Sequence, residues 1–293
     1  MNILVTGRDG QLARSLAAIS SNDIRYLTLG RPELDVARAE TVAQAIARFR
    51  PAAIVNAAAF TAVDEAEGAQ DQAFSVNRDG ARNVAAAAAE AGLPVIHIST
   101  DYVFAGDKPE PYCEDDPTEP KTVYGRSKLA GEDAVAKANR DHVILRTAWV
   151  YGPYGSNFVK TMLRLAKDRD VVRVVADQFG TPTYAPDIAT GIDAVVGRIV
   201  AAPGSSAWRG TFHMVAGGET SWAGFATAIF EESSRCGGPT AKVEEIASAD
   251  YPTPARRPSN SRLATDKFHL TFSHALPPWR DGLRRCLTTL SAT

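Results

Sequence analysis

The first half of the chain alternates short apolar runs with longer helical segments. Five of the apolar runs have the length of a strand, and they cover residues 3–6, 24–29, 53–56, 95–99 and 143–147. Runs that are apolar at nearly every position are typical of strands covered by helices on both faces. The alternation therefore predicts βαβ units around a parallel sheet, which is the doubly wound α/β fold.

Two closely spaced glycines follow the first expected strand and precede a helix. Gly7 permits a sharp turn, and Gly10 lets the backbone approach a pyrophosphate. The backbone amides of Gln11 and Leu12, at the start of the helix, would meet its charge. In this position the turn predicts a Rossmann-type dinucleotide site. The alternative is a plain tight connection between a strand and a helix.

The end of the second strand bears on the choice of cofactor. The chain there runs Leu29-Gly30-Arg31, so a guanidinium stands where an acidic residue would bind a ribose 2′-hydroxyl. This favours NADPH, with NADH as the alternative if Arg31 is only a solvated surface charge. Asp35 is expected to contact the adenine or its ribose, and Val36 belongs to the same expected cofactor site.

Tyr124 and Lys128 lie four residues apart at the start of an expected helix, so both side chains project from one face. A free tyrosine, with a pKa of about 10, exchanges protons reluctantly at neutral pH, but a nearby ammonium favours the phenolate. We therefore expect Lys128 to lower the pKa of Tyr124 and to bind the nicotinamide ribose. The pair indicates a carbonyl reductase, the alternative being a chance spacing on a helix surface.

Small and polar side chains follow two further strands, at the ends that would face the ligand crevice. Thr100 is the candidate hydroxyl for holding a substrate carbonyl, and Asp101 is available to a sugar hydroxyl or to the catalytic proton network. Ala58 and Ala59 would let a dinucleotide lie against the backbone. Two more residues complete the expected cofactor site, Phe60 and Ile98.

The regular alternation ends after Val150, where turn-rich sequence begins. A helix near residues 187–200 is expected to return to the sheet, and residues 222–232 and 251–262 are expected in a smaller lobe. We therefore predict an NAD(P)-binding Rossmann domain over residues 1–153 and a mainly substrate-binding lobe over residues 154–293.

With these motifs in place, the chain resembles the extended short-chain dehydrogenase/reductase superfamily, and within it the family of dTDP-4-dehydrorhamnose reductases. The resemblance runs nearly end to end, through residues 55–64, 99–104, 123–132, 146–151, 157–162, 177–183 and 251–261. It implies reduction of the C4 ketone of dTDP-4-dehydro-L-rhamnose by NADPH, the last step of dTDP-rhamnose synthesis. Two alternatives are a reductase or epimerase of another nucleotide sugar and a non-catalytic NADP-binding regulatory subunit.

The same resemblance implies roles for particular residues. Thr100, Tyr124 and Lys128 would be catalytic, and Asp101 and Trp149 would contact the dTDP-sugar. Asn157, Gln178 and Arg257 would contact the nucleotide or its diphosphate. Trp149 could instead be a core aromatic residue, and Arg257 a solvated charge on a loop.

The chain departs from the family's pattern in two places that concern the cofactor. Ala13 replaces the usual glycine, and Gly30-Arg31 replaces an acidic strand end. Some relatives pair through Mg²⁺ held by glutamates, but Ser15 and Pro186 stand where two of these would align. We therefore doubt that Mg²⁺ is bound, while a homodimer stays open.

Composition narrows the classes of function. A formal net charge of −2 leaves no excess of Lys or Arg for a nucleic acid or an acidic membrane surface. The three cysteines form no CxxC pair, and the five histidines form no HxxxH or HExxH pattern, so neither disulfides nor a metal site are indicated. Neither a signal peptide nor a membrane-spanning segment is expected, and we predict a cytoplasmic protein.

Overall fold

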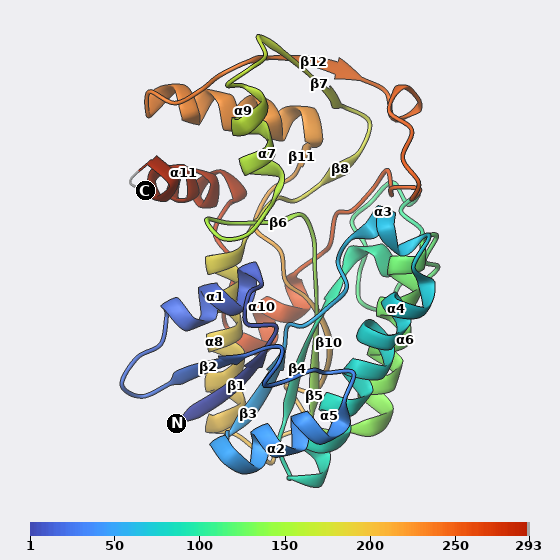
Figure 1. Ribbon diagram of the computed structural model, residues 1–293, viewed down its shortest axis with the longest axis vertical. Coiled ribbons are helices and arrows are strands. Elements are labelled where there is room, and N and C mark those ends of the chain that lie inside the picture. The colour runs from blue at the N-terminus through green and yellow to red at the C-terminus, as the bar shows by residue number, and fades with distance from the viewer. Residues whose placement is uncertain (292–293) are drawn as a thin grey trace.

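The computed structural model describes residues 1–291, so the last two residues of the expected lobe lie outside it. Its larger part is built on a six-stranded sheet in the order β10-β5-β4-β3-β1-β2 (Figure 1). All five pairings in this sheet are parallel. The strands are β1 (Asn2–Thr6), β2 (Arg25–Leu29), β3 (Ala53–Asn56), β4 (Val95–Thr100), β5 (His142–Thr147) and β10 (Gly210–His213). From β1 the chain first adds β2 on one side and then β3 on the other, which places the topological switch point between β1 and β3.

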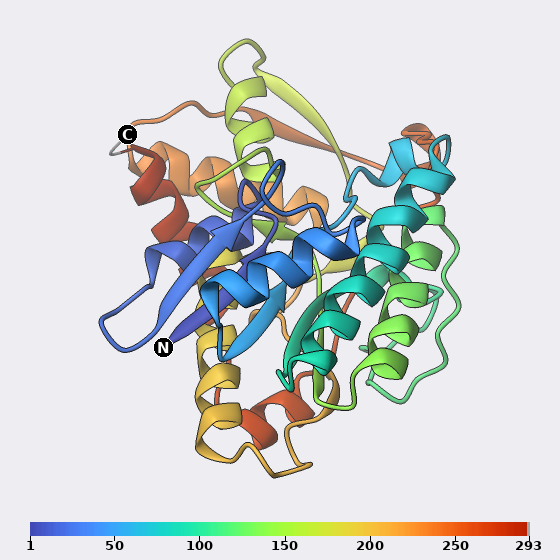
Figure 2. The ribbon, with the colours of Figure 1, turned by 60° about the horizontal axis from the view of Figure 1, so that its bottom comes forward.

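Helices cover both faces of the sheet because successive side chains of a strand point to opposite sides. On one face, Leu4, Ile54 and Ile144 pack against α2 (Ala39–Phe49), α5 (Ala81–Glu90) and α6 (Val123–Ala138). Figure 2 shows α5 and α6 side by side over this face. On the other face, Ile3, Val5 and Leu145 pack against α1 (Gln11–Ala18), α8 (Ala185–Ala201) and α10 (Asp266–Phe272). Between β3 and α5 lie α3 (Val63–Ala66), α4 (Gln70–Phe74) and a π-helical turn (Ser75–Gly80).

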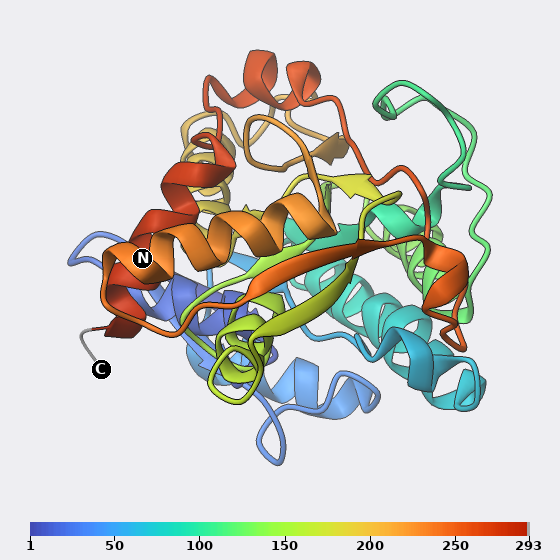
Figure 3. The ribbon, with the colours of Figure 1, turned by 90° about the horizontal axis from the view of Figure 1, so that it is seen from above.

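A smaller lobe stands at one end of this sheet and has a core of its own (Figure 1). Its helices are α7 (Phe158–Leu165), α9 (Trp222–Arg235) and α11 (Trp279–Ser291). Three pairs of short strands accompany these helices: β7 (Val171–Val175) with β12 (Lys242–Ile246), β8 (Phe179–Gly180) with β11 (Thr220–Ser221), and β6 (Val150–Tyr151) with β9 (Thr183–Tyr184). Figure 3 shows β7 and β12 running across the top of the molecule.

The Rossmann-type doubly wound sheet and the smaller C-terminal lobe predicted from the sequence are confirmed. The expected return helix is α8, which packs against α1. The sixth strand, β10, was not predicted, and it comes with α10 from the stretch that we had placed mainly in the lobe. Within residues 1–291, no helix is both long and apolar enough to cross a membrane.

Candidate active site

A cavity of about 790 Å³ opens at the switch point of the sheet. Its wall combines the segments after β1 to β5 with the first turns of α1 and α6. Most residues that the sequence analysis singled out line this one cavity: Gly7, Gly10, Gln11, Leu12, Arg31, Asp35, Val36, Ala58, Ala59, Phe60, Ile98, Thr100, Asp101, Tyr124, Lys128 and Trp149. The carboxyl ends of parallel strands meet at one edge of a sheet, which explains why distant segments converge here.

The turn between β1 and α1 keeps the backbone open toward this cavity. Gly7 has a φ of +82°, a conformation that L side chains rarely adopt, and a Cβ there would lie 3.0 Å from the backbone of Ala58. The N–H of Gly10 donates to the Gly7 carbonyl at 2.9 Å and closes the turn. The unpaired N–H groups in the first turn of α1, beginning at Gln11, therefore lie at the cavity wall, where they can bind an anion.

The end of β2 forms a charged rim. Arg31 is exposed there, and its carbonyl oxygen accepts a hydrogen bond from Arg8 Nη2 at 3.0 Å. Arg8 also pairs with Glu33 at 3.0 Å and lines the cavity, so two guanidinium groups stand at this rim. Only Arg31 could be named from the sequence as a cation at this rim. Arg8 belongs to the glycine turn, and it is the parallel pairing of β1 with β2 that places it beside the end of β2.

Helix α6 brings Tyr124 and Lys128 to the cavity, one turn apart. Its start is capped by Thr122, whose Oγ1 accepts the N–H of Gly125 at 3.0 Å. A Cβ on Gly125 would lie 2.2 Å from the carbonyl oxygen of Tyr102. Glycine at this position therefore lets α6 approach the segment that follows β4.

That segment carries Thr100 and Asp101, both buried. Thr100 Oγ1 donates to Asp101 Oδ1 at 2.9 Å and accepts the N–H of Tyr102 at 3.2 Å. The ring of Tyr102 meets the ring of Tyr124 edge to face, with 5.5 Å between the centroids. The hydroxyl of Thr100, the carboxyl group of Asp101 and the phenol of Tyr124 therefore line the same cavity as Lys128.

Burial controls the ionisation of these groups. It raises the pKa of Tyr124 above that of a free tyrosine, with the hydrogen bond to Thr100 opposing the shift and the charge of Asp101 adding to it. Burial also raises the pKa of Asp101 to about 6. It lowers the pKa of Lys128 to about 8, against the attraction of Glu132. The expected lowering of the tyrosine pKa by Lys128 is thus wrong in this structure, because burial raises that pKa and Lys128 is not among the groups that shift it. The lysine amine instead donates to the Ile98 carbonyl at 2.6 Å.

Trp149 lines the cavity and also joins the sheet to the smaller lobe. Its backbone has a φ of +49°, and its ring stacks on Trp222 at the start of α9, with 3.6 Å between the centroids and 10° between the planes. Trp149 thus packs against the smaller lobe and lines the cavity, and its contact with the dTDP-sugar stays a prediction. Trp222 was not singled out, because only the folded chain brings α9 against the end of β5.

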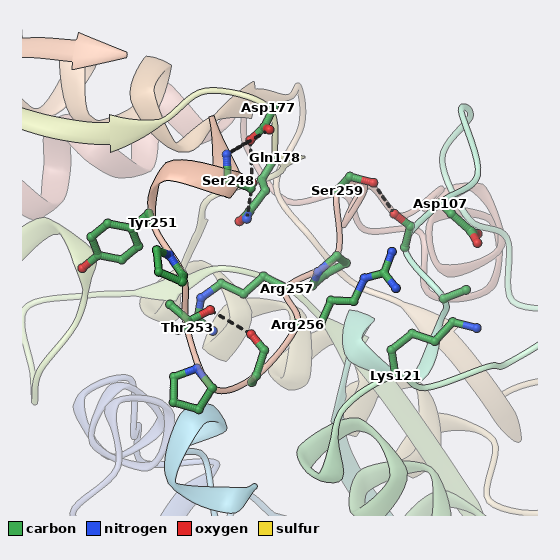
Figure 4. Close-up of a pocket in the computed structure, with 16 residues that line it drawn as sticks. Asp107, Lys121, Asp177, Gln178, Ser248, Tyr251, Thr253, Arg256, Arg257 and Ser259 are labelled. Atoms are coloured by element: carbon green, nitrogen blue, oxygen red, sulfur yellow. Dashed lines mark hydrogen bonds between the residues drawn. The ribbon is translucent and has the colours of Figure 1, made fainter. Parts of the chain in front are cut away.

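Gln178 and Arg257 line a second cavity, of about 580 Å³ (Figure 4). Gln178 is buried and donates from Nε2 to Ser248 Oγ at 2.9 Å, while Arg257 forms an ion pair with Asp64. Tyr102 lines the first cavity, where burial raises its pKa to about 12. The charge of Arg257, from the second cavity, opposes this rise. Gln178 and Arg257 are thus set apart from Tyr124 and Lys128.

Asn157 lies at the start of α7, beside Gln11. Its Oδ1 accepts the N–H of Lys160 at 3.2 Å and caps α7, and its Nδ2 donates to Gln11 Oε1 at 2.9 Å and to the Gly152 carbonyl at 2.8 Å. The oxygen and the nitrogen of the Asn157 side chain are therefore both hydrogen-bonded within the protein, the nitrogen to Gln11 among others. The nucleotide contact expected for Asn157 stays a prediction.

A buried polar chain behind the lysine was missed. Thr6 lies within hydrogen-bond distance of Asn56, and Asn56 within hydrogen-bond distance of His97. His97 in turn lies 3.4 Å from the Lys128 amine. From the sequence, the five histidines had been considered as possible metal ligands. The available signal was a histidine in the middle of an otherwise apolar strand.

Within residues 1–291, no group of three or more His, Cys, Asp and Glu side chains is arranged to hold a metal ion. Cys113, Cys236 and Cys286 are all free thiols.

A doubly wound sheet with a glycine turn at its switch point, and a tyrosine and a lysine one helical turn apart in the same cavity, defines a short-chain dehydrogenase/reductase. The family model described as RmlD substrate binding domain matches residues 1–292. The dTDP-4-dehydrorhamnose reductase of Sinorhizobium fredii is 52% identical, over 99% of this chain and 98% of its own length. That of Escherichia coli (strain K12) is 44% identical, over 100% and 99%. The chain belongs to the dTDP-4-dehydrorhamnose reductase family, within the extended short-chain dehydrogenase/reductase superfamily.

Comparison with solved structures supports this family assignment. The dTDP-4-dehydrorhamnose reductase from Bacillus anthracis in complex with NADP has a TM-score of 0.91 at 36% identity, and the match covers 98% of this chain and 99% of that one. A UDP-glucose 4-epimerase from Thermus thermophilus in complex with NAD, at 20% identity and a TM-score of 0.79 over 99% of both chains, shares the fold.

Proposed function

We propose that the protein reduces the C4 ketone of dTDP-4-dehydro-L-rhamnose to dTDP-L-rhamnose with hydride from NADPH, the last step of dTDP-rhamnose synthesis. The observation that carries this proposal is one cavity that holds the glycine turn together with Thr100, Tyr124 and Lys128. Identity of 52% to a dTDP-4-dehydrorhamnose reductase supports the substrate. A relative solved in complex with NADP supports the cofactor.

The cofactor site fits NADPH because Gly7 leaves open the space that a Cβ would fill against Ala58. The amides of Gln11 and Leu12 bind the pyrophosphate, and Arg31, with Arg8 beside it, binds the 2′-phosphate. The remaining parts of the cofactor lie against Gly10, Asp35, Val36, Ala58, Ala59, Phe60 and Ile98. When bound, NADPH supplies the hydride. NADH lacks the 2′-phosphate and is the weaker cofactor.

Tyr124 acts as the acid of the reduction. Its raised pKa keeps the phenol protonated at neutral pH, so it has a proton to donate to the oxygen of the C4 ketone. Thr100 holds that oxygen by a hydrogen bond. Lys128 binds the nicotinamide ribose and, as an ammonium, stabilises the phenolate that Tyr124 leaves behind.

The substrate reaches across both parts of the molecule. Asp101 and Trp149, in the first cavity, contact the sugar. Gln178 and Arg257, in the second cavity, contact the nucleotide or its diphosphate. Asn157 acts indirectly, by holding Gln11. On this account residues 1–153 mainly bind the cofactor and residues 154–293 mainly bind the substrate.

We place the protein in the cytoplasm, where free thiols such as Cys113 and Cys236 persist. A homodimer and the absence of a nucleic-acid partner belong to the same proposal, the latter because the net charge is −2.

The test follows the absorbance of the reduced nicotinamide with dTDP-4-dehydrorhamnose, using NADPH and NADH in turn. We expect turnover with both and a lower KM for NADPH. Turnover of other 4-keto nucleotide sugars but not of this one would reject the substrate. Binding of NADPH without oxidation, together with co-purification of an unrelated enzyme, would favour a regulatory subunit instead.

A further inference from the structure

A continuous chain of polar side chains runs through the sheet to the lysine of the site. Thr6, Asn56, His97 and Lys128 are each at most 2% exposed. Thr6 Oγ1 lies 2.7 Å from Asn56 Oδ1, Asn56 Nδ2 lies 3.1 Å from His97 Nδ1, and His97 Nε2 lies 3.4 Å from Lys128 Nζ. A chain this deep in an apolar sheet keeps its hydrogen bonds because water cannot replace them.

The hydrogen bonds of Thr6 indicate the direction of this chain. The N–H of Ala58 donates to Thr6 Oγ1 at 3.1 Å, and the hydroxyl of Thr6 in turn donates to Asn56 Oδ1. The amide of Asn56 therefore turns its NH₂ group toward His97 Nδ1, which must accept. A neutral imidazole that accepts at Nδ1 carries its proton on Nε2, the ring nitrogen nearest to Lys128.

His97 stays neutral. Burial, together with the charge of Lys128, holds the pKa of His97 well below its usual range. An Nε2–H directed at Lys128 suits a neutral amine, whose lone pair can accept it, whereas an ammonium would meet it donor against donor. The hydrogens of Lys128 have a partner of their own in the Ile98 carbonyl, at 2.6 Å.

We propose that His97 is a positioning residue for the reaction, which donates its Nε2–H to Lys128 and thereby favours the neutral form of the lysine amine. Its kinetic consequence rests on the function proposed above. The ammonium form of Lys128 stabilises the phenolate of Tyr124, so the ease with which the lysine loses its proton sets the pH above which turnover falls.

Other charged and titratable groups surround the lysine and act beside His97. Glu132, on the same helix, attracts the ammonium and raises its pKa, but it is paired with Arg146 of β5 at 2.7 Å. Tyr124 lies one turn earlier on α6, and Asp101 and Tyr102 follow β4. Of this set, His97 is the group whose ring nitrogen lies within hydrogen-bond distance of the lysine amine, at 3.4 Å.

The first test needs no substrate. Long-range ¹H–¹⁵N NMR of the protein labelled with ¹⁵N-histidine distinguishes the two neutral tautomers by their ring nitrogens, and the His97→Asn variant identifies the His97 signals by their loss. Above the pKa of Lys128, at pH 9, we expect a neutral ring protonated at Nε2. A ring protonated at Nδ1 at that pH, or a charged ring at pH 7, would overturn the inference.

The second test compares two replacements by the pH profile of kcat/KM. In His97→Asn the amide stands at the Nδ1 position, so contact with Asn56 is kept and the donor toward Lys128 is lost. In His97→Gln the amide reaches the Nε2 position and keeps that donor. Loss of the donor raises the pKa of Lys128, so we expect the alkaline limb to move up by about one pH unit in His97→Asn and to stay in His97→Gln.

His142→Asn is the matched control, because His142 is the first residue of β5 and the cavity lies beyond the last. This variant should leave the pH profile of kcat/KM unchanged. A merely structural role for His97 predicts lower turnover at all pH values with an unmoved limb, and that result would contradict the inference. If the protein fails to reduce dTDP-4-dehydrorhamnose while the NMR finds the Nε2–H tautomer, the proposed substrate is rejected and the assignment of His97 as a donor stands.

Discussion

At the scale of single residues, Tyr124 is the side chain on which the proposed chemistry depends most. Replacement by Phe keeps the ring and its edge-to-face contact with Tyr102 but removes the proton. We expect Tyr124→Phe to lower kcat by about 10²- to 10⁴-fold, with NADPH affinity in fluorescence titration nearly unchanged. Tyr154→Phe, whose ring lies under Arg14 and would still do so, is the control. Near-normal turnover of Tyr124→Phe would remove the tyrosine from the mechanism.

We expect Arg31 to decide the preference between NADPH and NADH. The 2′-phosphate of NADPH would lose a charged partner in Arg31→Ala, so we expect its KM to rise by about 10-fold while the KM for NADH stays within experimental error. Arg25→Ala, at the start of β2 and also exposed, is the matched control. An equal rise for both cofactors would show that Arg31 does not read the phosphate.

At the scale of elements, the approach of α6 to the segment after β4 depends on Gly125. An alanine Cβ would lie 2.2 Å from the backbone oxygen of Tyr102, which cannot move aside as a side chain could. We expect Gly125→Ala to lower the free energy of unfolding by about 1–3 kcal/mol in urea titrations. Gly197→Ala, in α8 with open space around it, should be neutral or stabilising. The opposite order of the two variants would refute this packing.

The elements were predictable where periodicity alone determines them. Five strands, α8 and the glycine turn follow from apolar runs and turn residues in the sequence. β10 did not, because it has only four residues, lies in turn-rich sequence and is defined by its pairing with β5. For the same reason the tyrosine and lysine could be paired from their spacing on one helix, whereas contacts between distant segments could not: Trp222 with Trp149, Asn157 with Gln11, and His97 with Lys128.

At the scale of the whole molecule, an ion pair joins the sheet to the smaller lobe. Arg285 of α11 holds both oxygens of Asp187 on α8 at 2.7 Å, and the carboxylate is 4% exposed. Arg285→Ala leaves this carboxylate buried and unpaired, so we expect a loss of about 2 kcal/mol in the free energy of unfolding. Arg284→Ala breaks an exposed pair with Asp281 and should have no detectable effect. Equal stability of the two variants would mean that the pair does not couple the two parts.

In the proposed reaction, hydride moves from C4 of the nicotinamide to C4 of the sugar. The most direct measurement uses NADPH with deuterium at both C4 positions of the nicotinamide and dTDP-4-dehydrorhamnose as substrate, with the product analysed by NMR and mass spectrometry. We expect dTDP-rhamnose that carries one deuterium at C4. A product with no deuterium, or with deuterium at another carbon, would contradict the proposed reduction.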